Sequence, residues 1–362
     1  MKHVSHRSRI VKFIFVQMAF TIVMGGFFPL EPAIIDPHSG PIELFRSTFG
    51  FMPEITSEHF IEHFNSAYGD SYQYLLMATG EQSIPPYALR PFYPSIIGKT
   101  VSIFVDSQND IMTFFKFIYL LNSTLNIAIL VAGAFFLYHA VEKVCEDQFL
   151  SLAIASLFVC NIGTIQTAPF FMLDILSYSI SALSVWLFIN KRFWPLIICL
   201  SIGVLIKEVI VIFTLLPISM VLTEKKFRML ALTFLPIFAF VFIRLFNGED
   251  PLSMQYGWNI SKGDISFHYA VSHLTNPLIF IIKIMSALGS VIIGWYLVRQ
   301  HIAFDLKVIS ILIFIAIITA NILLASRVPR VIFIIYPILA LAMASGCRFE
   351  QSISSAKPTK NI

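Results

Sequence analysis

Charged residues are scarce in this chain: Asp, Glu, Lys and Arg make up only 13% of its 362 residues. Soluble domains carry about 25% charged residues, so the composition excludes an ordinary soluble protein. Cysteine is scarce as well, and the four cysteines form no CxxC motif and no Cys/His cluster. The sequence therefore predicts neither a disulfide framework nor a zinc site. No basic stretch is interleaved with aromatic residues, which argues against nucleic acid as a partner.

Hydrophobic residues make up 57% of the chain and come in continuous blocks. Several blocks approach the ~20 residues that a helix needs to cross a bilayer. We therefore predict an all-α polytopic membrane protein with about ten transmembrane helices. The predicted spans are roughly 10–30, 113–139, 149–167, 170–189, 193–206, 208–222, 228–246, 276–298, 306–325 and 328–347.

The block 91–105 is ambiguous, because it is short and contains Lys99, Pro91 and Pro94. We expect a helix that lies in the membrane interface. Cytoplasmic loops carry an excess of Lys and Arg, and this choice gives the side of the termini 15 Lys or Arg against 6 Asp or Glu. The other 15 acidic residues then fall on the opposite side. Both termini are therefore expected in the cytoplasm, and the absence of a disulfide framework favours a bacterial inner membrane.

This topology places the unusual polar residues on the outer side of the membrane. We expect a transmembrane domain over 1–348, with a long outer loop at 31–112, and a disordered cytoplasmic tail over 349–362. Short amphipathic helices are predicted within the loop at 58–67 and 71–80. The outer side also receives Asp174, the Lys207-Glu208 turn, the loop 247–275 and the turn from Ser326 to Arg330.

Asp70 is the leading candidate for catalysis in the outer loop. Gly69 allows a turn before it and Tyr72 follows shortly after. Asp70 could cap the helix that begins at Ser71, or act as a general base that takes a proton from an acceptor hydroxyl. Asp36 ranks second, because the proline that follows it indicates a turn.

Four basic residues on the outer side are candidates for binding phosphate. Arg90 precedes a proline and could be an interfacial anchor or a guanidinium that grips phosphate. Arg327 and Arg330 could clamp a phosphate or cap helix ends. Lys207 interrupts an apolar run together with Glu208, and could either join an ion-pair network or bind a lipid phosphate.

Asp174 is an isolated acid near the outer end of a predicted helix. Such a residue is a functional candidate by default, and it could equally be the structural partner of Lys207 or Arg327. His59 and His63 are spaced like metal ligands on a helix, but no HExxH motif accompanies them. We therefore expect no metal.

The chain resembles the GT-C superfamily of polytopic glycosyltransferases, which includes protein O-mannosyltransferases and bacterial lipid A aminoarabinose transferases. The likeness reaches about residue 347. The features that carry it are Gly69-Asp70-Ser71-Tyr72-Gln73-Tyr74, Leu89-Arg90-Pro91-Phe92-Tyr93-Pro94, Asp174, Leu205-Ile206-Lys207-Glu208, and the closing Arg327, Arg330 and Pro337. Two features depart from the family pattern: Asp70 lies about 40 residues beyond the first predicted helix, and no soluble C-terminal domain follows.

The resemblance implies an inverting glycosyltransferase whose donor is a sugar on a polyprenyl phosphate. Asp70 would be the base, and Lys207, Arg327 and Arg330 would hold the departing phosphate. The sugar would be transferred on the outer face of the membrane, and the resemblance leaves open whether the acceptor is a glycan, a lipid or a protein. A polymerase or ligase of cell-envelope polysaccharide, with a lipid-linked acceptor, is a variant of this function. Two other functions remain open: a transporter or flippase of a lipid-linked sugar, and a non-catalytic scaffold of an envelope complex. No cofactor other than the lipid-linked donor is expected.

Overall fold

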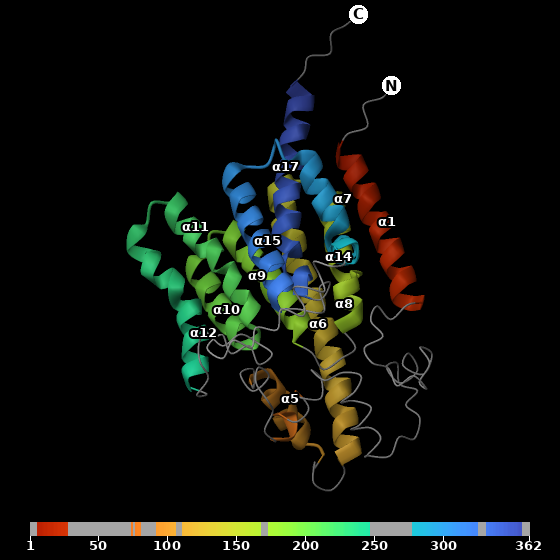
Figure 1. The fold of residues 1–362 in the computed structure, drawn as a ribbon, viewed down its shortest axis with the longest axis vertical. Helices are drawn as coiled ribbons and strands as arrows, with labels where there is room; N and C mark the ends of the chain where they lie inside the picture. Colours follow the sequence, from red (N-terminus) through yellow and green to blue (C-terminus); the bar gives the residue numbers. More distant parts are fainter. Residues whose placement is uncertain are drawn as a thin grey trace, which may run out of the picture.

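The protein is a bundle of helices (Figure 1). This computed structural model describes residues 6–27, 74, 77–80, 92–105, 111–167, 173–246, 277–324 and 331–356. Throughout these ranges the regular elements are helices and no strand occurs, which confirms the all-α prediction.

The helices follow the apolar blocks of the sequence, and four of the blocks are split in two. The elements are α1 (His6–Phe27), α5 (Phe92–Ser102), α6 (Ile111–Cys145), α7 (Gln148–Val159), α8 (Ile162–Thr167), α9 (Asp174–Ile189), α10 (Phe193–Ile206), η2 (Glu208–Thr214), α11 (Leu215–Thr223), η3 (Phe227–Phe234), α12 (Leu235–Phe246), α14 (Pro277–Val298), α15 (Phe304–Leu324), η5 (Phe333–Ile335) and α17 (Tyr336–Ala356).

Three helical stretches of the described residues are long and apolar enough to cross a membrane: Leu120–Cys145, Phe227–Leu245 and Phe280–Val298. Several other apolar helices have only 10–17 residues. These stretches support membrane association, but they do not confirm the expected ten spans. Some apolar blocks are interrupted by non-helical residues, as at Cys160–Asn161 and at Lys207, and the helices on either side of these breaks are short.

The interruption between α7 and α8 is stabilised by Asn161. Its side-chain oxygen accepts a hydrogen bond from the backbone N–H of Gly163 at 3.0 Å. Its side-chain nitrogen donates to the backbone oxygen of Ala287 on α14 at 2.7 Å. Because a buried backbone group costs free energy when it lacks a partner, this side chain makes the break tolerable. It also holds α14 against the α7–α8 junction.

The core of the bundle is an aromatic cluster around Phe333. Its ring lies 5.6 Å from that of Phe158, 5.0 Å from that of Tyr178 and 5.1 Å from that of Tyr336, measured between centroids. The Tyr336 hydroxyl donates a hydrogen bond to the backbone oxygen of Ile154 at 2.8 Å. The start of α17 is therefore fixed between α7 and α9.

The short helix α5 packs against the long helix α6 near the start of α6. The 35 residues of α6 give a length of about 52 Å. The Tyr93 hydroxyl on α5 donates to Asn122 Oδ1 on α6 at 3.2 Å, and burial raises the pKa of Tyr93 to about 12. With 11 residues, α5 is only about 16 Å long. It is therefore too short to cross a bilayer, in agreement with the helix expected at 91–105.

Part of the predicted helix 71–80 is also present. Tyr74, Met77 and Ala78 are helical and buried, with the i, i+3, i+4 spacing of one helix face. This face meets α5 closely, since a Cβ added at Gly98 would lie 2.0 Å from the backbone oxygen of Ala78. Glycine is therefore required at position 98 for this contact. The predicted helix 58–67 and the loop 247–275 lie outside the described residues.

The prediction of a disordered tail from residue 349 was wrong for its first part. The helix α17 continues to Ala356, whereas residues 357–362 lie outside the described ranges. A helix that is already nucleated in a packed core extends at little further cost. Arg348 also forms an ion pair with Glu146 at 2.6 Å, which holds α17 near the end of α6.

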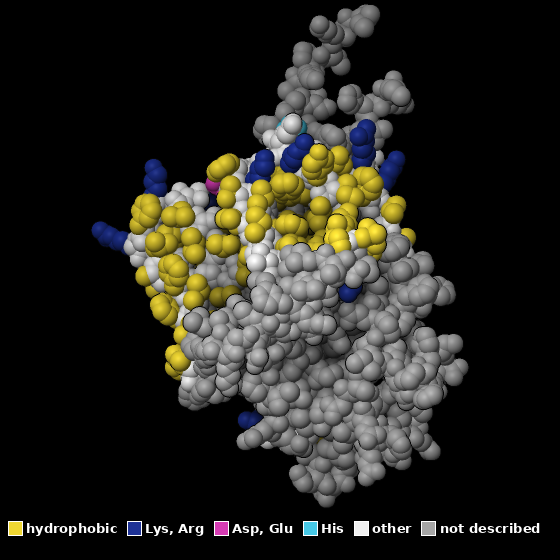
Figure 2. Space-filling model, in the orientation of Figure 1, with side chains coloured by type: hydrophobic (Ala, Val, Ile, Leu, Met, Phe, Trp, Pro, Cys, Tyr) yellow, Lys and Arg dark blue, Asp and Glu magenta, His cyan; other side chains and the backbone are white. Residues whose placement is uncertain are grey.

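One end of the bundle collects helix termini that the charge pattern assigned to the cytoplasmic side. We call it the basic end, defined by Arg7, Lys143, Asn190 and Arg348. Arg7 pairs with Asp147, Arg348 pairs with Glu146, and Lys143 donates to Asn190 Oδ1 at 2.7 Å. Figure 2 shows Lys and Arg side chains along the upper rim, above a broad band of hydrophobic side chains. The helix termini expected on one side of the membrane therefore lie together.

Candidate functional site

Lys207 lies at the tip of a helical hairpin, between α10 and η2. The helix α10 ends at Ile206, and Lys207 adopts an extended conformation, with φ −154° and ψ 122°. The chain then turns back as η2 and packs along α10. Gly203 makes this packing possible, because a Cβ there would lie 2.8 Å from Ile210 Cγ2. The hairpin predicted around the Lys207-Glu208 turn is therefore present.

Lys207 Nζ forms an ion pair with Asp174 Oδ1. The two side chains are 10% and 1% exposed, so both charges are withdrawn from solvent. Of the two structural partners that the sequence suggested for Asp174, the structure shows Lys207. Asp174 also lies in the first turn of α9, where the helix dipole favours a negative charge.

Because this pair is buried, each charge offsets the free-energy cost of burying the other. Removing an ion from water costs several kcal/mol, which only a well-placed partner can offset. Losing one partner of a buried pair therefore costs about 3–5 kcal/mol, because the remaining charge stays buried and loses this ion pair. Asp174 and Lys207 thus form a unit that links the first turn of α9 to the tip of the hairpin.

Other segments meet the first turns of α9 close to this pair. Tyr178, one turn after Asp174, contacts the ring of Phe333 edge-on, and Phe333 follows Arg330 by three positions. A Cβ added at Gly163 of α8 would lie 3.0 Å from Phe333 Cβ. We call the region of the ion pair the Lys207 end, defined by Asp174 and Lys207; the aromatic cluster of Tyr178 and Phe333 lies next to it. Figure 1 shows α5 beyond the tip of α10, away from both chain termini.

The remaining candidates divide between described and undescribed parts of the chain. Glu208 is the first residue of η2 and is half-buried. In the parts of the chain that the structure describes, no group of three or more His, Cys, Asp or Glu side chains could hold a metal ion. The candidates that lie outside the described residues are Asp36, Asp70, Tyr72, Arg90, Arg327 and Arg330, together with His59 and His63.

Sequence reasoning missed the polar contact between α6 and α9. Ser179 donates to the backbone oxygen of Ile129 at 2.9 Å, and a Cβ at Gly133 would lie 2.6 Å from Ser179 Oγ. Small residues allow helix backbones to approach closely in membranes. The signal available in the sequence was one small residue within each apolar helix, Gly133 and Ser179.

Comparisons of the chain with protein-family models, with curated proteins and with solved structures find no match.

Proposed function

We propose that this protein is a membrane glycosyltransferase that uses a polyprenyl-phosphate sugar as donor. The observation that carries the proposal is the buried Asp174–Lys207 pair at the Lys207 end. It supplies a fixed cation on the side of the bundle where α5 lies and to which the sequence motifs assign the outer loop. Ionisable residues inside membrane segments are rare and commonly mark substrate sites.

In the proposed reaction, Asp70 takes the proton from an acceptor hydroxyl. The acceptor oxygen forms a bond to the anomeric carbon of the sugar as the bond from that carbon to the phosphate oxygen breaks. The configuration inverts, and polyprenyl phosphate leaves with the bonding electron pair. Lys207, Arg327, Arg330 and Arg90 stabilise the negative charge that develops on this phosphate. Asp174 positions Lys207 for this role.

The same proposal assigns an orientation in a bacterial inner membrane. The basic end faces the cytoplasm, because Lys and Arg are enriched on that side of membrane proteins. The Lys207 end then faces the periplasm, where the acceptor glycan, lipid or protein is found. The Lys and Arg side chains along the rim of this end support the assignment (Figure 2).

The test compares wild type with Asp70→Asn, using radiolabelled polyprenyl-phosphate sugars and a membrane extract as acceptor. We expect wild type to transfer sugar and Asp70→Asn to lose about 10²-fold or more, as for removal of a general base. Asp106→Asn removes the same charge elsewhere in the loop and should retain activity. Undiminished transfer by Asp70→Asn would exclude Asp70 and make Asp36 the next candidate. No transfer from any donor would favour a scaffold or a transporter.

A transporter of a lipid-linked sugar is the second candidate, and the helix breaks at Asn161 and Lys207 favour it. Transporter sites are often formed by interrupted helices that leave polar groups within the membrane. Proteoliposomes loaded with a fluorescent lipid-linked sugar distinguish the two functions. A transporter moves the lipid between leaflets without an acceptor, whereas a transferase consumes the donor only when an acceptor is present.

A further inference from the structure

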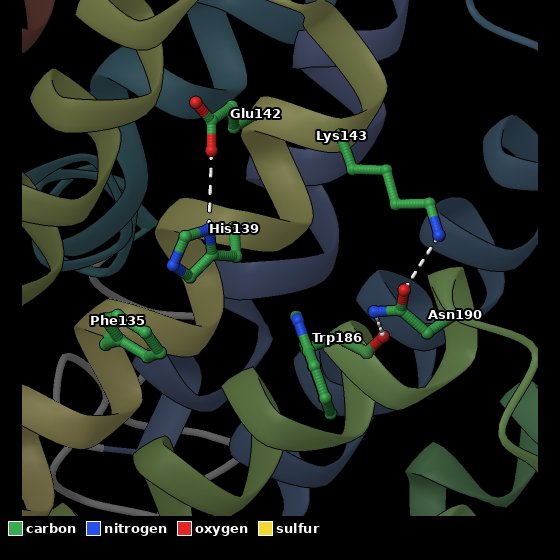
Figure 3. A pocket seen from close by; sticks show the side chains of 6 residues that line it. All are labelled: Phe135, His139, Glu142, Lys143, Trp186 and Asn190. Atoms are coloured by element: carbon green, nitrogen blue, oxygen red, sulfur yellow. Dashed lines mark hydrogen bonds and ion pairs between the residues drawn. The ribbon is translucent and has the colours of Figure 1, made fainter.

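An open pocket lies at the basic end, between the last turns of α6 and α9 (Figure 3). Its volume is about 550 Å³, and it is lined by Phe135, His139, Glu142, Lys143, Trp186 and Asn190. All four α6 residues fall within the last three turns of the apolar stretch Leu120–Cys145. The pocket therefore lies at the end of an apolar stretch that is long enough to cross a membrane.

The lining changes from apolar to charged along α6. Phe135 is the lining residue farthest from the end of α6, His139 follows one turn later, and Glu142 and Lys143 come on the next turn. These residues share one helix face, because positions four and seven or eight apart lie above one another. A phospholipid at an interface shows the same order, from acyl chain to glycerol ester to charged headgroup.

The aromatic part of the pocket offers a surface for an acyl chain. Phe135 is 58% exposed, and its ring lies 4.4 Å from that of His139, edge to face. Trp186 packs against Phe136 at 5.3 Å between ring centroids and forms the other wall. Aromatic side chains of this kind are enriched at membrane interfaces, where one end is apolar and the other is hydrated.

The polar part of the pocket holds one fixed cation and one fixed anion on opposite sides. The Glu142 carboxylate accepts a hydrogen bond from the Tyr138 hydroxyl at 3.2 Å and lies 3.3 Å from His139 Nδ1. Lys143 points away from it, toward Asn190 (Figure 3). The two charges are therefore held apart instead of neutralising each other. Together they complement a ligand that carries both a positive and a negative group.

We propose that this pocket binds a phospholipid with a phosphoethanolamine headgroup. Lys143 faces the phosphate, and Glu142 faces the ammonium. The acyl chain nearest the protein lies on Phe135 and Trp186. This binding site is independent of the proposed transferase reaction and lies at the opposite end of the bundle.

The charges of the pocket distinguish this headgroup from its common alternatives. A primary ammonium has three N–H groups that can donate hydrogen bonds, and a carboxylate such as Glu142 can accept from them. A choline group has the same charge but no N–H to donate. A phosphoglycerol headgroup has no cation, so Glu142 would repel it.

The test measures quenching of Trp186 by lipids with brominated acyl chains. Trp194, Trp258 and Trp295 are changed to Phe, so that Trp186 is the remaining tryptophan and can be excited selectively. The protein is placed in nanodiscs of equal mixtures of phosphatidylethanolamine, phosphatidylcholine and phosphatidylglycerol, with one of the three brominated at a time. We expect brominated phosphatidylethanolamine to quench about threefold more than phosphatidylcholine, as for one exposed ion pair.

Substitutions at neighbouring acids supply the control. Glu142→Gln should abolish the preference for phosphatidylethanolamine over phosphatidylcholine. Glu146→Gln removes a carboxylate one turn away that pairs with Arg348 instead, and should keep the preference. Lys143→Gln should weaken binding of all three phospholipids, because each carries a phosphate.

Native mass spectrometry of the otherwise unaltered chain gives the same comparison without tryptophan substitutions. After delipidation and addition of the three lipids in equal amounts, phosphatidylethanolamine adducts should predominate in wild type and in Glu146→Gln, but not in Glu142→Gln. Equal binding of the three lipids would overturn the proposal. A preference for phosphatidylglycerol would also overturn it, since the pocket would then be a site for anionic lipids governed by Lys143.

Discussion

Two ion pairs at opposite ends of the bundle, Arg348–Glu146 and Lys207–Asp174, differ in how far they are buried. At the basic end, Arg348 and Glu146 form an ion pair whose side chains are 52% and 67% exposed. At the Lys207 end, Lys207 and Asp174 are 10% and 1% exposed. Exposed pairs contribute about 0–1 kcal/mol, whereas breaking a buried pair costs several kcal/mol. The exposed pair should therefore contribute little to stability, whereas the buried pair should contribute strongly to the folding of its region.

The largest effect is expected from separating the buried pair. Lys207→Met leaves Asp174 buried without this partner, so the free energy of unfolding should fall by about 3–5 kcal/mol. Denaturation in mixed micelles, followed by circular dichroism, measures the loss. The double variant Lys207→Met with Asp174→Leu should recover much of it, because no charge remains buried. Equal stability of wild type and Lys207→Met would show that the pair is not buried in the membrane.

The next effect concerns the close packing that holds α5. Gly98→Ala places a methyl group against the backbone of Ala78, and overpacking of this kind costs about 1–3 kcal/mol. Hydrogen exchange should show reduced protection of α5, with little change at the basic end. Gly289→Ala is the control, because its added Cβ would approach its nearest neighbour, Met285 Cε, only to 3.4 Å. Equal loss in both variants would refute this account of Gly98.

A smaller effect should appear at high pH through Tyr93. Its pKa of about 12 in the folded protein exceeds the value near 10 of an unfolded tyrosine. Between these values the unfolded chain releases a proton that the folded protein retains, so stability should fall as pH rises from about 10 to 12. Tyr93→Phe should lose less stability over this range. The same slope in both proteins would show that Tyr93 is not buried.

The smallest effect is expected at the exposed pair of the basic end. Arg348→Gln should lower the free energy of unfolding by less than about 1 kcal/mol. Salt should reduce even this difference, because exposed charges are screened. Unfolding measured at low and high ionic strength checks the result, with Lys207→Met run in parallel. A loss at Arg348 as large as that at Lys207 would remove the distinction between the two ends.

The sequence predicted the helical blocks and the grouping of their ends, because apolar length and charge asymmetry are properties of single segments. It also suggested Lys207 as one partner of Asp174. The sequence did not predict the break at Asn161, whose stability depends on a backbone oxygen 126 positions away. The helical extension of α17 was missed for a similar reason, since packing of its first turns supports the later ones. Both the break at Asn161 and the extension of α17 depend on contacts with residues that are distant in the sequence.

The continuity of α6 has a mechanical consequence. Its 35 residues form one unbroken helix. Asn122, which binds Tyr93 of α5, lies about 30 Å along this helix from Glu142, which lines the pocket at the basic end. A change of about 10° in the tilt of such a rod moves one end by about 5 Å relative to the other, and helices tilt to match bilayer thickness. We therefore hypothesise that a change in membrane thickness changes the tilt of α6 and thereby moves α5. Transferase activity that is constant across bilayers of different acyl length would exclude this coupling.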